Sequence, residues 1–424
     1  MSAQPGRFGA AFLAEVEAVL APADAVLSGR YPGDDGSRQP VHTVYVPADR
    51  YSAGIAREWG QAALAAAAEH GGLAAIARST VARTDSDATA LAALVENKLR
   101  TEPIEDLRVD FEDGYGVRSD DEEDAAVAVA VTAIGNAGAA SPPFIGIRFK
   151  CFEADVRARG LRTLDLFVSG LAEAGELPTG LTLTLPKVTS TDQVVAMVSV
   201  ARELERVHGL PDGRIGFEIQ VETPQSVMSA DGTAAVAPMI HAGAGRVTAL
   251  HYGTYDYSAS LGIAAAYQSM EHPAADHAKA VMQLAAAGTG VRLSDGSTNI
   301  LPVGDAEAVE AGWALHARLV RRHLERGFYQ GWDLHPAQLV TRFLATYAFY
   351  RDGFGSAAVR LRNYAHQIES SVLDEPATAR ALAGFIRRGE LCGALTVDEV
   401  EAATDLPLTK VRELALHRPP APGA

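Results

Sequence analysis

The 424 residues carry a formal net charge of −16, which argues against a nucleic acid or an anionic membrane surface as the partner. Hydrophobic residues make up 48% of the chain and charged residues 21%, proportions typical of a globular protein with one large domain and an appendage. Two cysteines, Cys151 and Cys392, are too few for a disulfide framework or a cysteine-based zinc site. The N-terminus lacks a signal-peptide pattern and no run of about 18 apolar residues predicts a membrane span, so we expect a cytoplasmic protein.

The chain begins with a stretch that we expect to be a helical extension, over residues 1–40. From residue 41 onward, short β-branched or aliphatic runs alternate with Ala- and Leu-rich helical stretches, a pattern typical of a parallel sheet built from βα units. The runs are Val41–Pro47, Leu107–Asp113, Phe144–Lys150, Leu181–Val188, Ile215–Glu222, Val247–Asp256, Val291–Asp295 and Gly331–His335. Eight strands are the number that closes a barrel, so the sequence predicts an α/β fold, a (β/α)8 TIM barrel over residues 41–345.

Residues 346–424 are predicted to form a C-terminal helical segment with a proline-rich tail. RDGFG at 351–355 has the composition of a turn between two of its helices. The segment is long enough to act as a lid or as an element exchanged between subunits. Plain helical packing on the outside of the barrel is an equally good interpretation for its second half.

Alternation within the predicted strands separates an apolar face from a polar face. An open sheet needs apolar residues on both faces of its central strands, whereas a barrel lumen is a place where charges from neighbouring strands can pair. We therefore expect Arg108, Asp110 and Glu218 to form a buried structural network, and Gln220 to line the lumen beside them.

Acids and bases also stand at the carboxyl ends of the predicted strands. Strands two to six end on Glu112 and Asp113, Arg148, Lys187, Glu222, and Asp256. Catalytic groups of TIM barrels gather at this rim, because the loops that follow the strands build the site there. The convergence favours an active site over a structural network.

Glu222 and Asp256 close consecutive strands, five and six. Neighbouring strands lie about 4.8 Å apart, so carboxylates at their ends can share one cation, and without a cation they would repel each other. With only oxygen ligands the natural choice is Mg²⁺ or Mn²⁺. In the alternative interpretation each acid simply caps the helix that follows its strand.

Six motifs along the chain occur together in one order. They are VDFEDGYG at 109–116, GIRFK at 146–150, TLPKV at 184–188, VETPQSV at 221–227, GTYDYSASLG at 253–262 and GWDLHPAQ at 331–338. Their order and spacing resemble the superfamily of the citrate lyase β-subunit, malyl-CoA lyase and the HpcH/HpaI aldolases, over roughly residues 41–380. Each motif alone is weak, but six in register are specific.

The resemblance implies a magnesium site made by Glu222 and Asp256. It further implies that Arg148 grips the carboxylate of the substrate or its developing enolate oxygen. The backbone amides of Gly253, Thr254 and Tyr255 would hold the carboxylate.

The resemblance also assigns roles to acids outside the metal site. Glu112 and Asp113 would reach metal-bound water or orient Arg148. In thioester-using members an aspartate on a C-terminal segment reaches the site of a neighbouring subunit. The matching residue here is Asp374, which goes with a homo-oligomer, a trimer or a larger assembly.

One departure concerns the substrate. Lys150 stands where the superfamily usually has an asparagine, and it adds a positive charge near the presumed substrate. Lys150 and Lys187 are therefore candidates for binding a distal carboxylate. A Schiff base on Lys187 is an alternative chemistry that a metal pair makes superfluous.

These features predict a Mg²⁺-dependent carbon–carbon lyase. It would run aldol or Claisen-type cleavage or condensation of a small anionic hydroxy or keto acid, or of its CoA thioester, through a metal-stabilised enolate. The base would be a metal-bound hydroxide, Glu112, Asp113 or Asp374. The alternatives are a malate-synthase-like condensing enzyme, a phosphoenolpyruvate- or pyruvate-type transferase on the same barrel, and a barrel that only binds a ligand.

Overall fold

Eight strands alternate with helices along the chain. The computed structural model describes residues 7–175, 177–368 and 374–416. The strands are β1 (His42–Pro47), β2 (Asp106–Asp110), β3 (Phe144–Arg148), β4 (Leu181–Leu185), β5 (Gly216–Val221), β6 (Val247–Tyr252), β7 (Arg292–Ser294) and β8 (Gly331–Asp333). All neighbours pair in parallel in the order β7-β6-β5-β4-β3-β2-β1-β8, and a bridge between Ser294 and Gln330 joins the two ends of the sheet. The fold is the predicted (β/α)8 TIM barrel.

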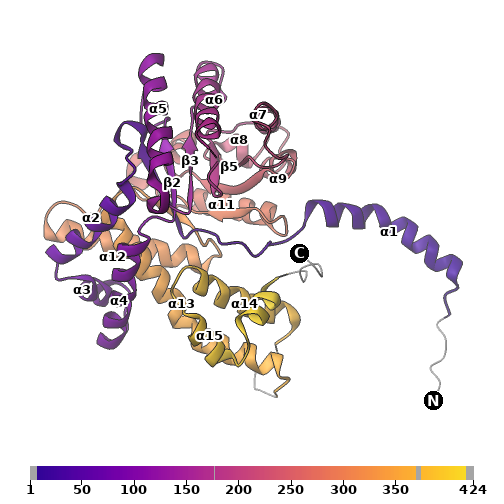
Figure 1. Cartoon of the computed structure of the whole chain (residues 1–424). Coiled ribbons are helices and arrows are strands. Elements are labelled where there is room, and N and C mark those ends of the chain that lie inside the picture. Colours follow the sequence, from indigo (N-terminus) through magenta and orange to yellow (C-terminus); the bar gives the residue numbers. More distant parts are fainter. Residues whose placement is uncertain (1–6, 176, 369–373, 417–424) are drawn as a thin grey trace.

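Helices connect the strands, and further helices precede the barrel at the N-terminus and follow it at the C-terminus (Figure 1). Those before and between the strands are α1 (Ala10–Arg30), α2 (Ile55–Glu69), α3 (Leu73–Thr80), α4 (Asp85–Thr101), α5 (Asp120–Ala137), α6 (Arg157–Ala174), α7 (Thr191–His208), α8 (Pro224–Val227), α9 (Val236–Ala242), α10 (Thr254–Ser260), α11 (Pro273–Ala286) and α12 (Ala306–Glu325). Those after β8 are α13 (Pro336–Ala365), α14 (Pro376–Leu391), α15 (Val397–Thr404) and α16 (Leu408–Ala415). Short 3-10 turns cover Ala48–Arg50, Gly138–Ala140 and Ala265–Tyr267.

The predicted division of the strands into two faces is confirmed. Their apolar residues, such as Val109, Ile147 and Phe217, are fully buried in one core cluster with residues of the surrounding helices. Glu218 in the lumen lies 2.7 Å from the Arg108 guanidinium and accepts a 3.2 Å hydrogen bond from the Tyr45 hydroxyl. The lumen therefore holds a buried charge network.

Strands two and four end earlier than predicted, at Asp110 and Leu185, and two further predictions are wrong. The sixth strand ends at Tyr252, and Asp256 lies in the first turn of α10, because the chain leaves the sheet at Gly253. RDGFG at 351–355 is not a turn but lies inside the continuous helix α13. A side-chain carbon on Gly353 would stand 2.7 Å from Cζ of Phe385, so the glycine allows α14 to pack closely on α13.

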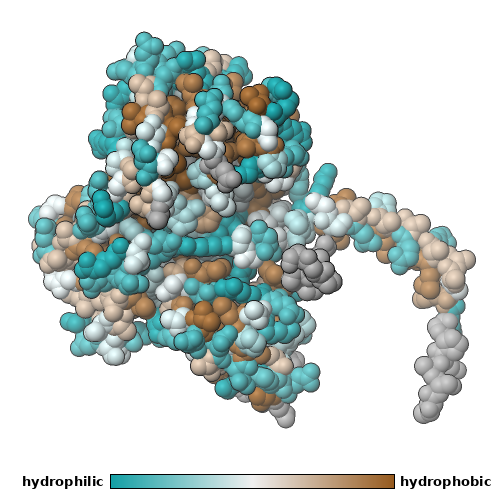
Figure 2. Space-filling view, viewed as in Figure 1, coloured by the Kyte–Doolittle hydropathy of each residue, from teal (hydrophilic) through white to brown (hydrophobic). Residues whose placement is uncertain are grey.

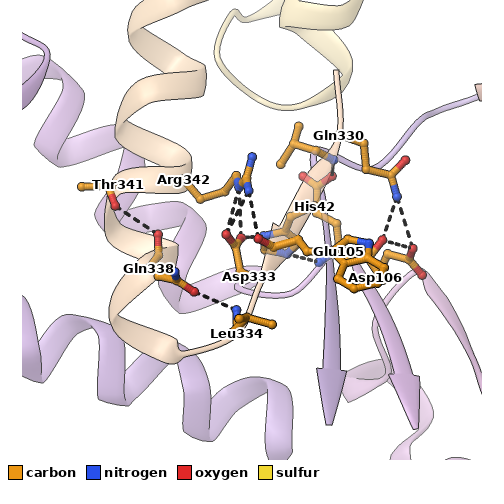
Figure 3. A network of polar contacts seen from close by, with 12 residues as sticks. His42, Glu105, Asp106, Gln330, Asp333, Leu334, Gln338, Thr341 and Arg342 are labelled. Carbon is orange, nitrogen blue, oxygen red and sulfur yellow. Dashed lines mark hydrogen bonds and ion pairs between the residues drawn. The ribbon is translucent and has the colours of Figure 1, made fainter. Parts of the chain in front are cut away.

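A buried polar network ties β8 and β1 to α13 (Figure 3). Asp333 lies 3.0 Å from the Arg342 guanidinium, 2.9 Å from Nδ1 of His42 and 3.1 Å from Nε2 of His316. Nε2 of His42 accepts a hydrogen bond from the amide of Glu105 at 3.1 Å, so Nδ1 carries the proton that is donated to Asp333. Four elements, β1, β8, α12 and α13, thus meet at one buried carboxylate where the barrel closes.

The C-terminal helices form an apolar cluster of their own with α13. Arg387 and Arg388 of α14 line a cavity together with Val41 and Arg292, which stand at the amino ends of β1 and β7. Within one chain this segment therefore lies at the end of the barrel opposite the rim of acids and bases (Figure 1).

The N-terminal helix α1 projects from the body of the molecule, and none of its residues is buried (Figure 1). Figure 2 shows apolar side chains along this helix, among them Phe12, Val19 and Leu27, which are about half exposed or more. In the described part of the chain, no helix combines the length and the apolar character that crossing a membrane requires.

Candidate active site

The carboxyl ends of five consecutive strands carry the predicted site residues. Each predicted group leaves the sheet at or just beyond the last strand residue, in the order Glu112 and Asp113 after β2, Arg148 at the end of β3, Lys187 after β4, Glu222 after β5, and Asp256 after β6. Parallel strands bring these ends to one rim, so residues far apart in sequence become neighbours.

Lys187 connects most of this rim. Its amine contacts a carboxylate oxygen of Glu112 and lies 2.8 Å from Asp113 and 3.9 Å from Asp256. Its backbone amide donates a 2.7 Å hydrogen bond to Oε1 of Glu222. The predicted metal ligands and two predicted acids therefore lie within reach of one residue.

The backbone of Lys187 is in the left-handed region, with φ of 49°. This conformation is uncommon for residues other than glycine and is retained where the surrounding structure requires it. Burial disfavours the charged amine, but Glu112 and Glu222 outweigh it and raise the pKa of Lys187 above its ordinary value. A protonated amine is a poor nucleophile, which argues against the Schiff-base alternative.

Glu222 is 2% exposed and lies against Gly253 at the end of β6. A side-chain carbon on Gly253 would stand 2.4 Å from Cβ of Glu222 and 2.6 Å from Oε2, so only glycine leaves room for the carboxylate. Burial raises the pKa of Glu222 to about 8, and Asp256 adds to the shift while Lys187 opposes it. Two neighbouring carboxylates, one of them buried, repel each other when both are ionised, and a bound cation would relieve that repulsion.

The donor set fits magnesium better than a tightly caged metal. Within residues 7–175, 177–368 and 374–416, no group of three or more His, Cys, Asp or Glu side chains is arranged to hold a metal ion. Mg²⁺ is usually bound through one or two carboxylates and completes its coordination with water and substrate oxygens. Glu222 and Asp256 match that requirement.

Arg148 is held by an acid whose role the sequence did not reveal. Its Nε and Nη2 donate to the two oxygens of Asp110 at 2.7 and 2.6 Å, and its guanidinium lies 4.8 Å from the ring centre of Tyr45. One edge of the guanidinium is thus occupied, and Nη1 remains directed toward Glu112 at 3.4 Å. Asp110 was expected in the network of Arg108 and Glu218. Its true partner follows from the sheet register, which places Asp110 opposite Arg148.

Glu112 and Asp113 differ in environment. Burial raises the pKa of Glu112, with Asp113 adding to the shift and Arg148 opposing it. Asp113 is about half exposed, and although burial opposes it, Arg148 and Lys187 lower the pKa of this carboxyl. Glu112 therefore keeps a proton to higher pH than Asp113 does.

The remaining predicted residues have contacts elsewhere in this chain. The Lys150 amine donates to the carbonyl of Phe111 at 2.8 Å and lies 2.5 Å from Glu123 of α5. Asp374 lies 2.5 Å from Arg360 of α13 and makes no contact here with the rim. Their roles in substrate binding and in a neighbouring subunit's site stay predictions.

The segment proposed to hold a carboxylate is fixed to the loop after β7. Thr254 donates a 3.1 Å hydrogen bond to the carbonyl of Ser297, and the Tyr255 hydroxyl accepts one of 2.5 Å from the amide of Asn299. The Gly253 amide donates a 3.1 Å hydrogen bond to the carbonyl of Val221, so, contrary to the prediction, it is not available to a substrate. The amides of Thr254 and Tyr255, at the start of α10, have no carbonyl four residues earlier within the helix and remain available to an acceptor.

Gln220 is the second residue that sequence analysis undervalued. It is fully buried on the lumen face of β5 between Glu218 and Glu222, and neither polar atom of its amide has a partner among the described residues. An unsatisfied buried amide is costly, so a water molecule or a polar ligand atom is expected beside it. Only the three-dimensional arrangement reveals this, because strand alternation gives the face but not the partners.

Gly253→Ala tests the contact between Gly253 and Glu222. We expect the added carbon to displace the carboxylate and to weaken Mg²⁺ binding by about tenfold or more, the range found for groups that orient metal ligands. Since φ of Gly253 is −98°, alanine is tolerated by the backbone and the effect is steric. Gly135→Ala, where nothing lies within 4 Å of the added carbon, is the control for isothermal titration calorimetry. Equal Mg²⁺ affinity in both variants would show that Gly253 has no part in positioning the Glu222 carboxylate for the metal.

The raised pKa of Glu222 predicts a pH dependence of metal binding. A cation binds the carboxylate, so protons compete with it below a pKa of about 8. Mg²⁺ affinity should therefore rise by roughly tenfold per pH unit toward pH 8 and level off above it. Calorimetric titrations at several pH values measure this, and an affinity independent of pH would contradict it.

Comparisons with known proteins place the chain in a family. The family model described as "Domain of unknown function (DUF6986)" matches residues 20–419. A search of curated proteins finds no match.

The chain is similar to several solved structures. Haloferax volcanii malate synthase in a magnesium/glyoxylate complex has 15% identity and a TM-score of 0.47, covering 89% of this chain and 98% of that one. Protein CitE from Mycobacterium tuberculosis, in complex with magnesium, acetoacetate and coenzyme A, has 19% identity and a TM-score of 0.47, covering 84% and 100%. An HpcH/HpaI aldolase/citrate lyase family protein from Burkholderia cenocepacia has 16% identity and a TM-score of 0.42, covering 75% and 95%.

Proposed function

The chain belongs to the DUF6986 family, and we propose that it is a Mg²⁺-dependent carbon–carbon lyase or condensing enzyme that acts on a small hydroxy or keto acid. The observation that carries the proposal is the arrangement around Lys187, whose amine and amide contact Glu112, Asp113 and Glu222 and whose amine lies 3.9 Å from Asp256. Cations and carboxylates alternate here at the end of the barrel where barrel chemistry takes place.

Glu222 and Asp256 would hold the metal. Magnesium bound there would supply Lewis-acid stabilisation of the negative charge that develops on a carbonyl oxygen. The lysine amide that binds Glu222 keeps its carboxylate fixed, and the absence of a side chain on Gly253 leaves it room.

Arg148 would bind the substrate carboxylate or the charge that develops next to it. Asp110 occupies the Nε edge of the guanidinium and so directs Nη1 toward the rim. A guanidinium already oriented in this way loses little freedom when a ligand binds, which favours electrostatic stabilisation. The amides of Thr254 and Tyr255 would donate to a carboxylate oxygen, whereas the Gly253 amide already donates to the carbonyl of Val221.

Glu112 would hold and move the proton of the reaction. It is buried beside Arg148 and Lys187, and its pKa is raised by burial, which favours the protonated form that a general acid needs. Asp113 is the more exposed alternative, and Asp374 of a second copy would contribute in a homo-oligomer. The exposed apolar side chains of α1 support such an association.

The test is an assay with the full-length protein, Mg²⁺ and a panel of α-keto acids with and without acetyl-CoA. Glyoxylate and pyruvate carry one carboxylate each and oxaloacetate carries two, so the panel varies both the length and the charge of the keto acid. Loss of the α-keto acid monitors condensation, and release of free thiol shows whether the thioester of the product is then hydrolysed. Carbonyl formation from the matching hydroxy acids or their thioesters monitors cleavage. We expect turnover that EDTA abolishes and Mg²⁺ restores. No turnover across the panel in either direction, or turnover indifferent to EDTA, would count against the proposal.

A further inference from the structure

A second polar cavity lies at the opposite end of the barrel. It has a volume of about 200 Å³ and is enclosed by the segment before β1, the start of β7 and helix α14. Three arginines line it, Arg292 from β7 and the adjacent Arg387 and Arg388 from α14. It shares no lining residue with the rim that carries Glu222 and Arg148.

The acids that face these arginines are distant and few. Asp34 lies 3.5 Å from Arg387 and 3.7 Å from Arg388, and Asp35 lies 3.9 Å from Arg292. A charge-assisted hydrogen bond spans about 2.7–2.9 Å, so none of these three pairs is a close contact. The side chains of Asp34 and Asp35 are 42% and 75% exposed, so water already solvates them.

Arg387 is the exception among the buried arginines of the described residues. The others, Arg108, Arg148, Arg246 and Arg342, each have a carboxylate oxygen within 3.0 Å. Arg387 is 4% exposed, yet among the described residues its one close acceptor is the carbonyl of Ser37 at 3.3 Å. A buried guanidinium without a close anion is costly.

The neighbouring arginines increase this imbalance. Burial, together with the repulsion from Arg387, lowers the pKa of Arg292 although Asp35 opposes the shift. Arg388 lies with its guanidinium 4.3 Å from the ring centre of Tyr329, which fixes its direction without neutralising it. Three positive charges therefore face two distant, solvated negative ones.

We propose that this cavity binds a small phosphate-class oxyanion, either inorganic phosphate or a short phosphomonoester. Guanidinium groups pair with phosphate through planar, paired hydrogen bonds, and several arginines can share one such anion. The small volume excludes a nucleotide or another drug-sized ligand, whose pockets start at roughly 300 Å³. The bound ion would join the segment before β1 to α14 and so fix both extensions to the barrel.

The test is calorimetric titration of the full-length protein with inorganic phosphate in Mg²⁺-free buffer. We expect one phosphate per chain and a loss of affinity of about tenfold or more in Arg387→Gln, because a charged hydrogen-bonding partner is removed. Arg412→Gln, an exposed arginine of α16 that pairs with Glu390, is the matched control and should bind like the parent. Glycerol 3-phosphate, titrated in parallel, distinguishes a phosphomonoester from the free ion by the tighter of the two affinities.

Asp34→Asn is expected to change the phosphate affinity in the opposite direction, and it removes no buried charge. If Asp34 competes with the ligand for Arg387 and Arg388, the variant binds phosphate more tightly than the parent. Unchanged or weaker binding in Asp34→Asn overturns the proposal, even where Arg387→Gln fails to fold. Absent binding by the parent, or binding lost on Arg148→Lys instead of Arg387→Gln, also overturns it.

Discussion

Glu222→Gln is expected to lower kcat/KM of the Mg²⁺-dependent reaction by about 10³-fold or more, equivalent to roughly 4 kcal/mol of transition-state stabilisation. The amide keeps the size of the side chain and can still accept the hydrogen bond from the Lys187 amide. It cannot supply the negative charge that holds a divalent cation. Steady-state kinetics with the substrate found in the panel measure the loss.

The same variant separates function from folding. A folded-state pKa raised to about 8 means that Glu222 favours the native state below its unfolded value of 4.5 and loses that contribution as the pH rises through 8. Glutamine has no such loss, so the metal-free variant should be at least as thermally stable as the metal-free parent at pH 9. An inactive variant that is also strongly destabilised under those conditions would point to a structural role for Glu222.

Asp333→Asn is expected to destabilise the fold by about 3–5 kcal/mol, because it leaves a buried guanidinium without its carboxylate. Arg342 is 1% exposed and has Asp333 as its close anion (Figure 3). His42 and His316 converge on the same carboxylate. Thermal unfolding of the metal-free protein followed by circular dichroism measures the change.

The control for this variant is Glu203→Gln, which removes one partner of an exposed ion pair with Arg206 on α7. Exposed pairs contribute little, so its melting temperature should match that of the parent. If Asp333→Asn melted at the same temperature as Glu203→Gln, the network between β1, β8 and α13 would have no part in holding the barrel closed.

Strand alternation and strand ends were sufficient to predict the barrel and the residues at its rim. Alternation alone places Glu218, in β5, and Glu222, just beyond its end, on the same side of the chain. Their positions along the chain then predict that Glu218 lies in the lumen and Glu222 at the rim. The residues at which the strands end could not be predicted from this alternation. Polar rim residues such as Asp256 continue the strand pattern in sequence although the chain has already turned into α10.

Pairing across elements was the part that sequence could not supply. Parity places Asp110 in the lumen, but only the register with β3 shows that it holds Arg148. Nothing in the sequence indicates that Lys150 has a partner within the chain, and only the position of α5 shows that Glu123 lies 2.5 Å from it. Gly353 in RDGFG suggests a turn in the sequence. Its role is to let Phe385 of α14 pack closely against α13, and that contact joins residues far apart in the chain.

The central claim is that Glu222 and Asp256 together hold a divalent cation. Isothermal titration calorimetry of the metal-free protein with Mg²⁺ at pH 8.5 tests it most directly, with Glu222→Gln and Asp256→Asn measured alongside the parent. The account predicts one Mg²⁺ per chain in the parent and an affinity at least about 100-fold weaker in each variant, since each loses a charged ligand. Equal Mg²⁺ affinity in all three proteins, or no binding by the parent, would contradict it.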